Sequence, residues 1–540
     1  MGLRRVTLRI FRGINLRQRR EAVANLGHDC VMVTENQASA ETFLTAQQRL
    51  AEPAAIAPVV TTHISKIFLA GERVFKLKRA VRFAYVDFST AALRLAACQS
   101  ELALNRRTAP SLYLAVRRIT RAADGTIGFD GDGTLIDAVV EMRRFDQTGL
   151  FDALALRNAL TPRLIADLAN RIAVFHAAAA VSMTGGGAKA MQGVLAINEQ
   201  SLRATALVPS GIAGDLSNRF RAALLRHGPL LDKRRGAGKV RRCHGDLILR
   251  NICLIKGVPV LFDCLEFNED LATIDVLYDL AFLVMDLMHR EQAAHANGLF
   301  NRYFDETNDS DGLALMAFFM SVRAAVRAHV TAAQAQDMPG ADAGPVTREA
   351  RAYFDLASLL LAPPSPRLMA IGGYSGTGKS TIATALAPNL GVPPGARILS
   401  SDRIRKRLHG VPAEQRLPPE AYAPEISARV YATLREKACE ALDAGVSVIA
   451  DAVFDRPGER EAIEAIARQI AVPFTGLWLD APEQTLAQRI TARTHDASDA
   501  TLEVLDRQMQ QDPGVLTWRR TDAGRPVPAI VADVLALLQT

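Results

Sequence analysis

Cysteine is scarce in this chain of 540 residues, and the cysteines that it has do not group into a metal-binding pattern. The six cysteines are Cys30, Cys98, Cys243, Cys253, Cys264 and Cys439. No two of them have the CxxC spacing, which excludes a zinc-finger type of ligand set. Such sparse use of cysteine is typical of reduced thiols in a cytoplasm. We therefore expect each cysteine to be a small buried hydrophobic side chain.

Long apolar runs are absent as well. The most apolar stretches, such as Leu280–Met285, are interrupted by acidic residues within a few positions. A helix that crosses a bilayer needs about 20 consecutive apolar residues. The sequence therefore predicts no membrane span and no membrane partner.

A long basic stripe is the third missing feature, although the chain carries a net charge of +7. Residues 1–31 hold seven arginines against Glu21 and Asp29, so this segment accounts for +5 and leaves +2 for everything that follows. A nearly neutral body argues against nucleic acid as a partner. Residues 1–31 also lack the apolar region of a secretory signal. We interpret them as an upstream translation extension, with Met32 as the natural start, and a transit-like or flexible arm is the alternative.

The length of the chain is too great for one hydrophobic core and predicts two or three domains. Its 49% hydrophobic and 22% charged residues are ordinary for a globular protein. The clearest boundary is the stretch Leu361–Arg367, which contains three prolines in four positions. We therefore expect a basic extension, a first domain, a proline-rich linker and a second domain, at residues 1–31, 32–362, 363–366 and 367–540.

The pattern of apolar residues differs on the two sides of this linker. Before it, strand-like hairpins at 60–90, 115–143 and 252–262 are mixed with long helical runs, which predicts an α+β domain. After it, short apolar strands alternate with helical runs, which predicts an α/β domain with a parallel sheet. The predicted strands are Leu368–Gly372, Arg397–Ser400, Val446–Ala450 and Thr475–Leu479.

The strongest motif opens the second domain, where residues 373–380 match the GxxxxGK[ST] pattern in full. It follows a predicted strand and starts the helical run Lys379–Leu386, which is the context that a phosphate-binding loop requires. Its glycines let backbone N–H groups turn toward phosphate oxygens, and the helix N-terminus adds partial positive charge. We predict that Lys379 reaches the β- and γ-phosphates of ATP and that the Ser380 hydroxyl binds Mg²⁺. The predicted ATP-binding residues are Gly373, Tyr374, Ser375, Gly376, Thr377, Gly378, Lys379, Ser380 and Thr381.

Two carboxylates follow other strands of this half. Asp402 and Asp451 each come just after a predicted strand, and ligands of open α/β sheets bind at the carboxyl ends of the strands. We predict that Asp402 accepts the proton of a substrate hydroxyl and that Asp451 supports Mg²⁺ or positions the substrate. The alternative is that either carboxylate only caps the next helix.

Arg489 and Arg493 lie four residues apart in the predicted helix Glu483–Thr494 and so share one face. Arginines that close over a transferring phosphate neutralise its developing charge, although exposed helix arginines are common. Together with the loop and with Ser401-Asp402, Asp451–Phe454 and Asp496–Ala500, they resemble the small P-loop kinases typified by gluconate kinase, zeta-type toxins and chloramphenicol phosphotransferase. The resemblance covers roughly 366–540. It implies that Asp402 is the catalytic base and that both arginines belong to the lid.

The first domain carries a second constellation, the sequence HGDLILRN at 244–251, followed by Asp263. The protein-kinase pattern H-R-D-L-x-x-x-N, followed by D-F-G, has the same spacing from Asp to Asn. In that pattern the first Asp orients the acceptor hydroxyl, while Asn and the later Asp hold Mg²⁺. A two-residue turn at Lys256-Gly257 predicts that Asn251 faces Phe262 across a hairpin. Asn251 and Asp263 would then meet at its open end.

A site of this kind also needs a lysine for the α- and β-phosphates of ATP and an acid to hold that lysine. Lys76 and Lys78 share one face of the strand that follows a turn at Gly71-Glu72. Either lysine fits, and Lys76 is preferred. Glu101, in the helical run Ala91–Arg106, is the predicted partner. Each group alone is commonly a solvated surface residue, but the whole set occurs in the expected chain order.

The first domain thus resembles the aminoglycoside-phosphotransferase branch of the kinase-like fold. The whole chain, from about 40 to 540, resembles bacterial proteins that fuse such a domain to a P-loop kinase of the AAA-family ATPase type. The supporting segments include Thr62–Ser65, Asp87–Ser89, Glu101–Asn105, Met142–Phe145 and Asp275–Ala281. The resemblance implies that Asp246 is the catalytic base and that Asn251 and Asp263 are Mg²⁺ ligands.

The same resemblance implies an adenine hinge at the backbone of Glu141, Met142 and Arg143, and structural roles for Asp275 and Asp279. His244 is expected to brace its loop. Two features depart from the family: Ile248 stands where HGDLH-type sequences have a second histidine, and the hairpin Thr61–Arg73 has a single glycine.

These motifs predict a bifunctional kinase in which each half transfers the γ-phosphoryl group of Mg-ATP to a hydroxyl of a small molecule. The expected acceptor is a sugar, an aminoglycoside-like compound or a nucleotide-like metabolite. The alternative is an ATP-binding regulatory switch whose first domain binds a ligand without turnover, and the intact set Asp246, Asn251 and Asp263 argues against it. A polynucleotide 5′-hydroxyl kinase in the second half is disfavoured by the near-neutral charge there, and salt-sensitive binding of single-stranded DNA would favour it.

Overall fold

The computed structural model describes residues 35–52, 57–62, 64–83, 86–336, 338, 342–363, 365–492 and 498–538. The predicted extension at residues 1–31 lies outside these ranges. The chain divides into two compact units: the first comprises residues up to 159 with 174–282 and 322–357, and the second comprises 160–173, 283–321 and 358–540. The division runs through helices α5 (Pro162–Ala178), α9 (Val276–His289), α11 (Met316–Gln336) and α12 (Ala343–Leu360).

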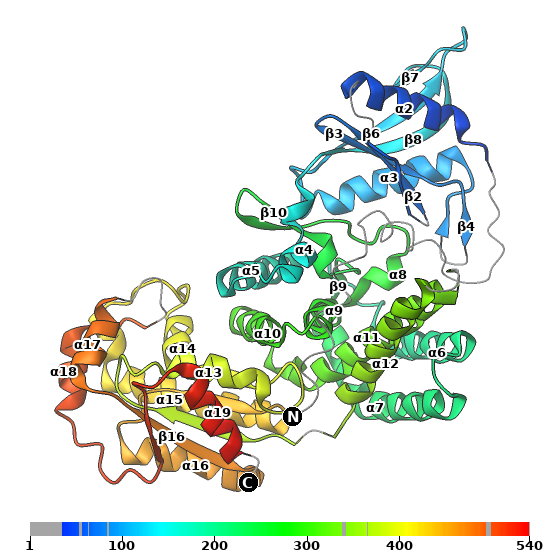
Figure 1. Ribbon diagram of the computed structural model, residues 1–540. Helices are drawn as coiled ribbons and strands as arrows, with labels where there is room; N and C mark the ends of the chain where they lie inside the picture. The colour runs from blue at the N-terminus through cyan, green and yellow to red at the C-terminus, as the bar shows by residue number, and fades with distance from the viewer. Residues whose placement is uncertain are drawn as a thin grey trace. The chain divides into compact units, whose positions relative to one another are not determined.

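The first unit begins with a six-stranded antiparallel sheet in the order β1-β2-β3-β8-β6-β7 (Figure 1). Its strands are β1 (Val60–Thr61), β2 (Ser65–Ala70), β3 (Arg73–Lys78), β6 (Tyr113–Arg121), β7 (Ile127–Phe129) and β8 (Thr134–Arg143). Successive residues of a strand point to opposite faces of the sheet. On β8, Val139 packs in one cluster with Leu44 of helix α2 (Ala38–Ala51), whereas Val140 packs in another with Cys98 of helix α3 (Ala91–Asn105). The two helices therefore cover opposite faces of the sheet.

The rest of the first unit is mostly helical and contains short antiparallel strand pairs. The pairs are β4 (Arg82–Phe83) with β5 (Val86–Asp87), β9 (Val240–Arg242) with β12 (Thr273–Asp275), and β10 (Ile252–Ile255) with β11 (Val258–Leu261). The further helices are α4 (Phe151–Leu156), α6 (Gly187–Thr205), α7 (Ser210–Gly236) and α8 (Glu269–Ala272). Ile255 pairs with Val258, so the predicted two-residue turn at Lys256-Gly257 is confirmed. Both turn residues have positive φ, at 50° and 78°, as a tight hairpin with right-twisted strands requires.

The second unit contains a five-stranded parallel sheet in the order β14-β15-β13-β16-β17. The strands are β13 (Leu368–Gly372), β14 (Arg397–Ser400), β15 (Val448–Asp451), β16 (Phe474–Asp480) and β17 (Arg519–Asp522). The first two match the predicted ranges, and β15 and β16 differ from theirs by one or two residues at the ends. The fold class predicted from the alternation of strands and helices is confirmed.

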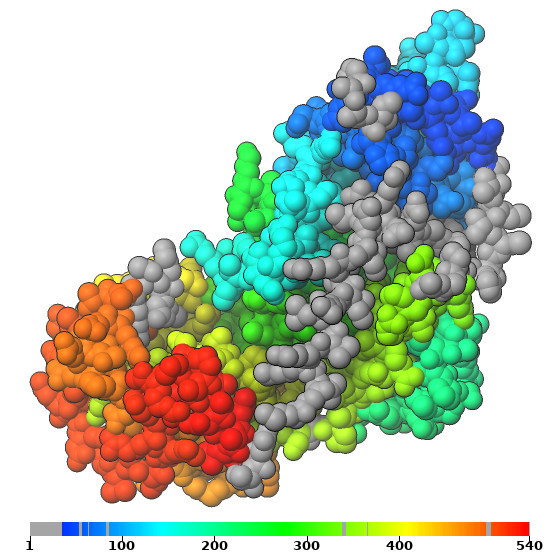
Figure 2. Space-filling view, in the orientation of Figure 1, coloured from blue at the N-terminus to red at the C-terminus, as the bar shows by residue number. Residues whose placement is uncertain are grey.

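Helices surround this sheet, and in the space-filling view the C-terminal residues of the unit, in orange and red, form one continuous part of its surface (Figure 2). The helices that follow the strands are α13 (Lys379–Leu386), α14 (Ser401–Leu408), α15 (Pro424–Asp443), α16 (Pro457–Ile470), α17 (Glu483–Thr491), α18 (Leu502–Met509) and α19 (Val527–Leu537). A buried cluster that includes Met369, Ile371, Ile382, Ile449 and Leu477 forms the core beside the central strand.

Helix α10 (Ala293–Thr307) also belongs to the second unit and covers the edge strand β14. The Asn301 side chain accepts a hydrogen bond from the backbone N–H of Ile398 at 2.8 Å. The Asn297 amide donates to the backbone C=O of Ala396 at 3.0 Å. Because an edge strand presents unpaired backbone groups, these asparagines replace a neighbouring strand.

Helical residues Ser310–Gln336 are long and apolar enough to cross a membrane by length and composition, with a mean hydropathy of 1.4 in the most apolar window. In the structure 72% of that window is buried inside the protein. The burial of this helix in the structure explains its apolar composition. The five cysteines in the described ranges are free thiols, and four of them are buried.

Candidate functional sites

In the first unit, Lys76 of β3 lies between two carboxylates that are far away in the sequence. Its Nζ is 2.8 Å from Glu101 Oε1 on α3 and 2.7 Å from Asp263 Oδ1 in the loop after β11. The Glu101 side chain is fully buried, whereas that of Asp263 is 42% exposed. Asp263 has a φ of 61°, and its backbone N–H donates to the Tyr113 hydroxyl at 3.2 Å. Three predicted site residues are thus brought together.

Burial disfavours the charged form of each of these groups, but their mutual attraction outweighs it. Against burial, Asp263 and Glu101 raise the pKa of Lys76 well above its usual value. Against burial, Lys76 lowers the pKa of Asp263 to about 2, and Lys76 and Lys78 lower the pKa of Glu101. All three groups are therefore ionised at neutral pH, as the binding of phosphate and metal requires.

The predicted base and the predicted amide ligand are also adjacent. The Asn251 side-chain amide donates to both the backbone C=O and Oδ2 of Asp246, each at 2.9 Å. Arg250 lies 3.4 Å from the same Oδ2. The backbone N–H of Phe262 donates to the C=O of Asn251 at 3.0 Å, so the hairpin places Asn251 opposite Phe262 as predicted. The carboxylate of Asp263 and the amide oxygen of Asn251 are the oxygen ligands that suit Mg²⁺.

A buried aspartate holds the loop that carries Asp246. The two carboxylate oxygens of Asp279 accept hydrogen bonds from the backbone N–H groups of His244 and Gly245, at 3.0 and 2.9 Å. His176 Nε2 lies 3.1 Å from the same carboxylate. The His244 ring lies 3.0 Å from the C=O of Phe262, which fits a bracing role. Asp275, expected to act like Asp279, instead binds Arg234 of α7 at 2.8 Å.

The predicted adenine hinge is partly engaged in the sheet. Glu141, Met142 and Arg143 are the last residues of β8, and the backbone N–H of Arg143 donates to the C=O of Leu112 at 2.8 Å. The first residues beyond the strand are 144–146. Adenine recognition at this hinge would therefore use only those backbone atoms that the sheet leaves available, and the assignment stays a prediction.

Sequence reasoning missed two contributors to this site, Glu266 and the role of Lys78. Lys78 Nζ lies 2.5 Å from Glu101 Oε2 and also contacts Glu266 Oε1. Burial is the main reason why the pKa of Glu266 is raised. The available signals were the alternation of two lysines on β3 and an acid three residues after Asp263.

In the second unit, the phosphate-binding loop follows the central strand β13 and requires glycine at particular positions. Gly376 has a φ of 89°, and a Cβ there would lie 2.7 Å from the backbone oxygen of Leu486. Gly373 has a φ of 135°, and a Cβ there would lie 2.5 Å from the oxygen of Leu479. Helix α13 then begins at Lys379, with its N-terminus facing the loop.

Two side chains of the motif have defined partners. Lys379 Nζ donates to the backbone oxygens of Gly373 and Tyr374 at 2.9 and 3.0 Å, so the lysine lies along the loop. The Ser380 hydroxyl donates to Asp451 Oδ2 at 2.6 Å. A serine hydroxyl beside a carboxylate at the end of β15 is a fitting oxygen donor set for Mg²⁺. The structure thus brings together the two predicted metal ligands of this half.

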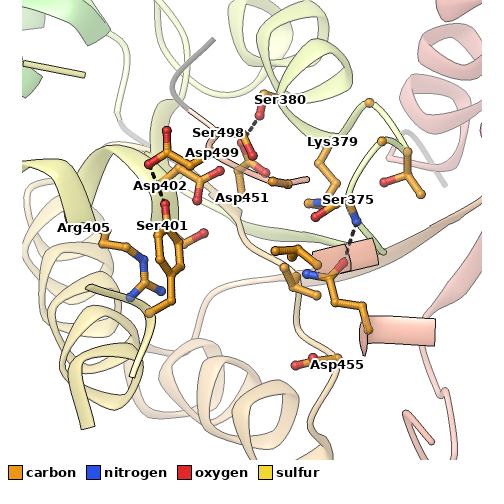
Figure 3. A pocket seen from close by; sticks show the side chains of 18 of the residues that line it. Ser375, Lys379, Ser380, Ser401, Asp402, Arg405, Asp451, Asp455, Ser498 and Asp499 are labelled. Atoms are coloured by element: carbon orange, nitrogen blue, oxygen red, sulfur yellow. Dashed lines mark hydrogen bonds between the residues drawn. The ribbon is translucent and has the colours of Figure 1, made fainter. Parts of the chain in front are cut away.

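A cavity of about 1050 Å³ connects the loop with the other predicted residues. Ser375–Ser380, Thr381, Asp402, Asp451 and Arg489 all line it. Figure 3 shows the side chains of Asp402, Asp451 and Asp499 directed into this cavity together with Lys379. Arg489 donates to the backbone oxygen of Ala523 at 2.9 Å. Arg493 lies outside the described residues.

The far side of this cavity contains groups that sequence reasoning missed. Asp499 accepts hydrogen bonds from Lys406 at 2.6 Å, from the Tyr422 hydroxyl at 2.7 Å and from the backbone N–H of Leu417 at 2.9 Å. Burial, the hydrogen bond to Asp499 and the nearby charge of Asp402 raise the pKa of Tyr422, so its hydroxyl stays protonated. Asp499 lies within the segment Asp496–Ala500 that supported the resemblance to P-loop kinases. The neighbouring residues, however, give no sign that Asp499 binds Lys406.

One loop N–H is also taken by a side chain from another element. The backbone N–H of Ser375 donates to Gln508 Oε1 of α18 at 2.9 Å. In a phosphate-binding loop such N–H groups point at phosphate oxygens. The Gln508 side chain therefore occupies a donor that a bound nucleotide would use.

Comparison with known proteins places each candidate site within a region that matches a known family. Residues 74–319 match the model of the phosphotransferase enzyme family, and residues 368–512 match that of an AAA domain. The chain therefore contains a kinase-like phosphotransferase domain within residues 74–319 and a P-loop kinase-like domain within residues 368–512. The two motifs that carried the resemblance fall inside these matches, which confirms the family assignment.

The chain is 28% identical over 477 residues to an uncharacterized protein of Mycobacterium tuberculosis (strain ATCC 25618 / H37Rv). The aligned residues cover 86% of this chain and 92% of the relative. A protein of Mycobacterium bovis (strain ATCC BAA-935 / AF2122/97), also described as uncharacterized, gives the same values. The relatives thus share both domains, and their descriptions name no activity.

Two solved structures are similar to parts of the chain. A choline/ethanolamine kinase family protein from Mesorhizobium loti is 16% identical, covers 60% of this chain and 95% of its own, and has a TM-score of 0.38. A gluconokinase from Sinorhizobium meliloti 1021 is 22% identical, covers 32% of this chain and 91% of its own, and has a TM-score of 0.23. At these TM-scores the two likenesses carry no argument about activity.

Proposed function

We propose that this protein is a bifunctional ATP-dependent phosphotransferase, with one acceptor site in residues 32–362 and another in residues 367–540. Each half would transfer the γ-phosphoryl group of ATP to a hydroxyl of a small molecule. The observation that carries the proposal is the presence of two separate sets of groups, one around Lys76 and Asp263 and one around Lys379 and Asp451. Each set contains a cation for phosphate, oxygen ligands for a metal and a nearby carboxylate.

In the first half, Lys76 binds the α- and β-phosphates of ATP and Asp246 accepts the proton of the acceptor hydroxyl. The hydrogen bond from the Asn251 amide to Asp246 Oδ2 supports this role because it fixes the direction of the other carboxylate oxygen. Asn251 and Asp263 would hold Mg²⁺. Catalysis of phosphoryl transfer depends mainly on such positioning and on neutralisation of charge.

In the second half, the loop N–H groups and Lys379 bind the β- and γ-phosphates, and Ser380 and Asp451 would hold the metal ion. The chemistry that Mg²⁺ would supply at either site is neutralisation of the negative charge of the phosphates during transfer. Asp402, which lines the same cavity, accepts the proton of the acceptor. Arg489 lies within reach of the cavity to stabilise the transferring group.

The acceptors belong to the class of small hydroxyl compounds, including sugars, aminoglycoside-like compounds and nucleotide-like metabolites. The sizeable cavity beside Asp402, lined by both acidic and basic side chains, supports a polar acceptor. We place the protein in the cytoplasm, where ATP is available and where its unpaired cysteines stay reduced.

The test is phosphoryl transfer from Mg-ATP into a broad metabolite extract, read by mass spectrometry. Wild type is compared with Asp246→Asn and Lys379→Ala, and Lys189→Ala, at an exposed position, is the control. We expect distinct phosphorylated products to disappear with each site variant and all of them to persist in the control. If no product forms while both sites still bind ATP, the protein is a nucleotide-dependent switch and the proposal is wrong.

A further inference from the structure

A second lysine lies behind Lys76 in the first unit, and it is more deeply buried. The side chains of Lys78 and Glu101 are fully buried, and that of Glu266 is 5% exposed. Lys78 Nζ lies 2.5 Å from Glu101 Oε2, as an ion pair, and also contacts Glu266 Oε1. The Phe88 ring lies 5.5 Å from the same Nζ.

Glu101 is therefore shared between two lysines. Its Oε1 contacts Lys76 and its Oε2 contacts Lys78. The result is a row of five charged side chains: Asp263, Lys76, Glu101, Lys78 and Glu266. Binding of phosphate and metal requires only Asp263, Lys76 and Glu101. The presence of Lys78 and Glu266 therefore needs a separate explanation.

Stability does not supply that explanation. Removing two charges from water costs several kcal/mol per ion, and replacing a buried ion pair by apolar side chains is often neutral or stabilising. Without a function, a lysine and a glutamate that are buried in this way would therefore lower the stability of the fold. Their positions instead point to the site that they adjoin.

We infer that Lys78 and Glu266 are positioning residues, which hold Glu101 in place when Lys76 turns toward the phosphates of a bound nucleotide. This inference rests on the proposed function of the first site. In the structure, Lys76 is shared between Glu101 and Asp263. When phosphate oxygens compete for Lys76, Glu101 keeps a cation at its second oxygen and remains an ionised, fixed partner.

The position of Glu266 adds a link to the metal ligand. Glu266 follows Asp263 by three residues, so one loop both anchors Lys78 and carries Asp263. The backbone N–H of Cys264, between them, donates to Asn105 Oδ1 of α3 at 2.8 Å. Helix α3, strand β3 and this loop are thus tied together at the point where Lys76 is held.

The experiment measures binding of Mg-AMPPNP to the full chain by calorimetry, in a Lys379→Ala background that silences the loop of the second unit. Lys78→Met and Glu266→Gln are compared with Lys66→Met. Lys66 is the matched control because it lies on β2 and pairs with Glu41 while 25% exposed. Each variant is checked for folding by circular dichroism and thermal unfolding.

A double variant separates positioning from simple structural support. Lys78→Met with Glu266→Met removes both charges of the pair, so thermal stability should return toward that of the parent. If the pair positions Glu101, nucleotide affinity stays reduced, by about tenfold relative to the Lys66→Met control. A merely structural pair predicts that affinity recovers together with stability.

The outcomes distinguish the two proposals. If the parent binds Mg-AMPPNP and the folded double variant binds within about twofold of the control, the positioning role is wrong and the proposed function stands. If the parent with Lys379→Ala binds no nucleotide at all, the proposed function of the first site fails, and the positioning role fails with it. Reduced affinity in a folded, stable double variant supports both.

Discussion

Asp279 shows how much one residue can determine in the first site. Its carboxylate accepts hydrogen bonds from the two backbone N–H groups that precede Asp246 and lies 3.1 Å from His176. Burial raises the pKa of this carboxyl group, but the His176 hydrogen bond and nearby positive charges outweigh it and lower the pKa to about 2. The ionised form therefore belongs to the folded state, and the loop position depends on it.

This depressed pKa predicts how stability changes with acid. Because the folded pKa lies below the usual value of 3.8, Asp279 stabilises the fold above about pH 4, by about 2 kcal/mol. That contribution is lost as the pH falls from about 4 to about 2. Urea unfolding of wild type and Asp279→Asn should show a gap in stability that is constant between about pH 7 and about pH 5 and narrows by about pH 3. A difference in the free energy of unfolding that is equal at all three pH values would contradict this prediction.

Gly376 is a second single residue on which a site depends, this time through backbone shape. Any side chain there meets both a positive φ of 89° and the oxygen of Leu486. We expect Gly376→Ala to reduce ATP binding by the second unit at least about tenfold, since the loop must shift to admit the Cβ. Gly193→Ala, in helix α6 with open space around it, is the control and should be neutral or slightly stabilising. Fluorescent-nucleotide titration checks both, and unchanged affinity in Gly376→Ala would refute the prediction.

At the scale of elements, the edge strand β14 matters most because it leads into helix α14, whose second residue is Asp402. Helix α10 provides side-chain partners to this strand: Asn301 binds the N–H of Ile398, and Asp305 pairs with Arg397. Arg397 also donates to Asn301 Oδ1 at 2.8 Å. These side chains satisfy polar groups that are buried at the strand, which keeps the first turn of α14, with Asp402, in a defined place.

Removing one of these partners should therefore be costly. Asn301→Ala leaves the half-buried N–H of Ile398 without its acceptor and removes one of the acceptors of the Arg397 side chain, so we expect the stability of the second unit to fall by about 1–3 kcal/mol. Asn218→Ala, at an exposed position on α7, should change stability by less than about 0.5 kcal/mol. Chemical unfolding followed by the fluorescence of Trp478 and Trp518 measures the second unit. A loss as small as that of the control would show that α10 does not support β14.

At the scale of the whole molecule, the packing units and the family matches do not have the same limits. The phosphotransferase match ends at residue 319, whereas the second packing unit includes residues 283–321 with α10. A helix from the first family region therefore completes the sheet of the second. A cut at the proline-rich stretch would therefore separate α10 from the sheet whose edge it covers.

Residues 365–540 expressed alone should consequently be less stable than the second unit in the full chain, because β14 has an open edge. A peptide of residues 290–309, which contains α10, should raise the melting temperature of this fragment in a concentration-dependent way. The same peptide with Asn301→Ala is the matched control and should have a weaker effect. Differential scanning calorimetry checks this, and a fragment as stable as the second unit of the full chain would contradict the prediction.

The features that the sequence predicted well are those encoded by neighbouring residues. The phosphate-binding loop, the alternation of strands and helices after it and the turn at Lys256-Gly257 all depend on local backbone preferences and on periods of two or 3.6 residues. The order of the kinase-like groups in the first half could also be predicted from the sequence, because the residues of the motif at 244–251 belong to a single loop. The roles of these residues in catalysis remain predictions.

By itself, then, the sequence determined the two kinds of domain, and it predicted a phosphate site in each of them together with the residues that compete for each role. Only the tertiary structure decided that Lys76, rather than Lys78, reaches Asp263, that both lysines share Glu101, and that Lys406 binds Asp499. It also decided that α10 covers β14. The physical reason is distance along the chain: Lys76 and Asp263 are 187 residues apart, and no local pattern encodes a contact that arises only when separate elements pack and exclude water.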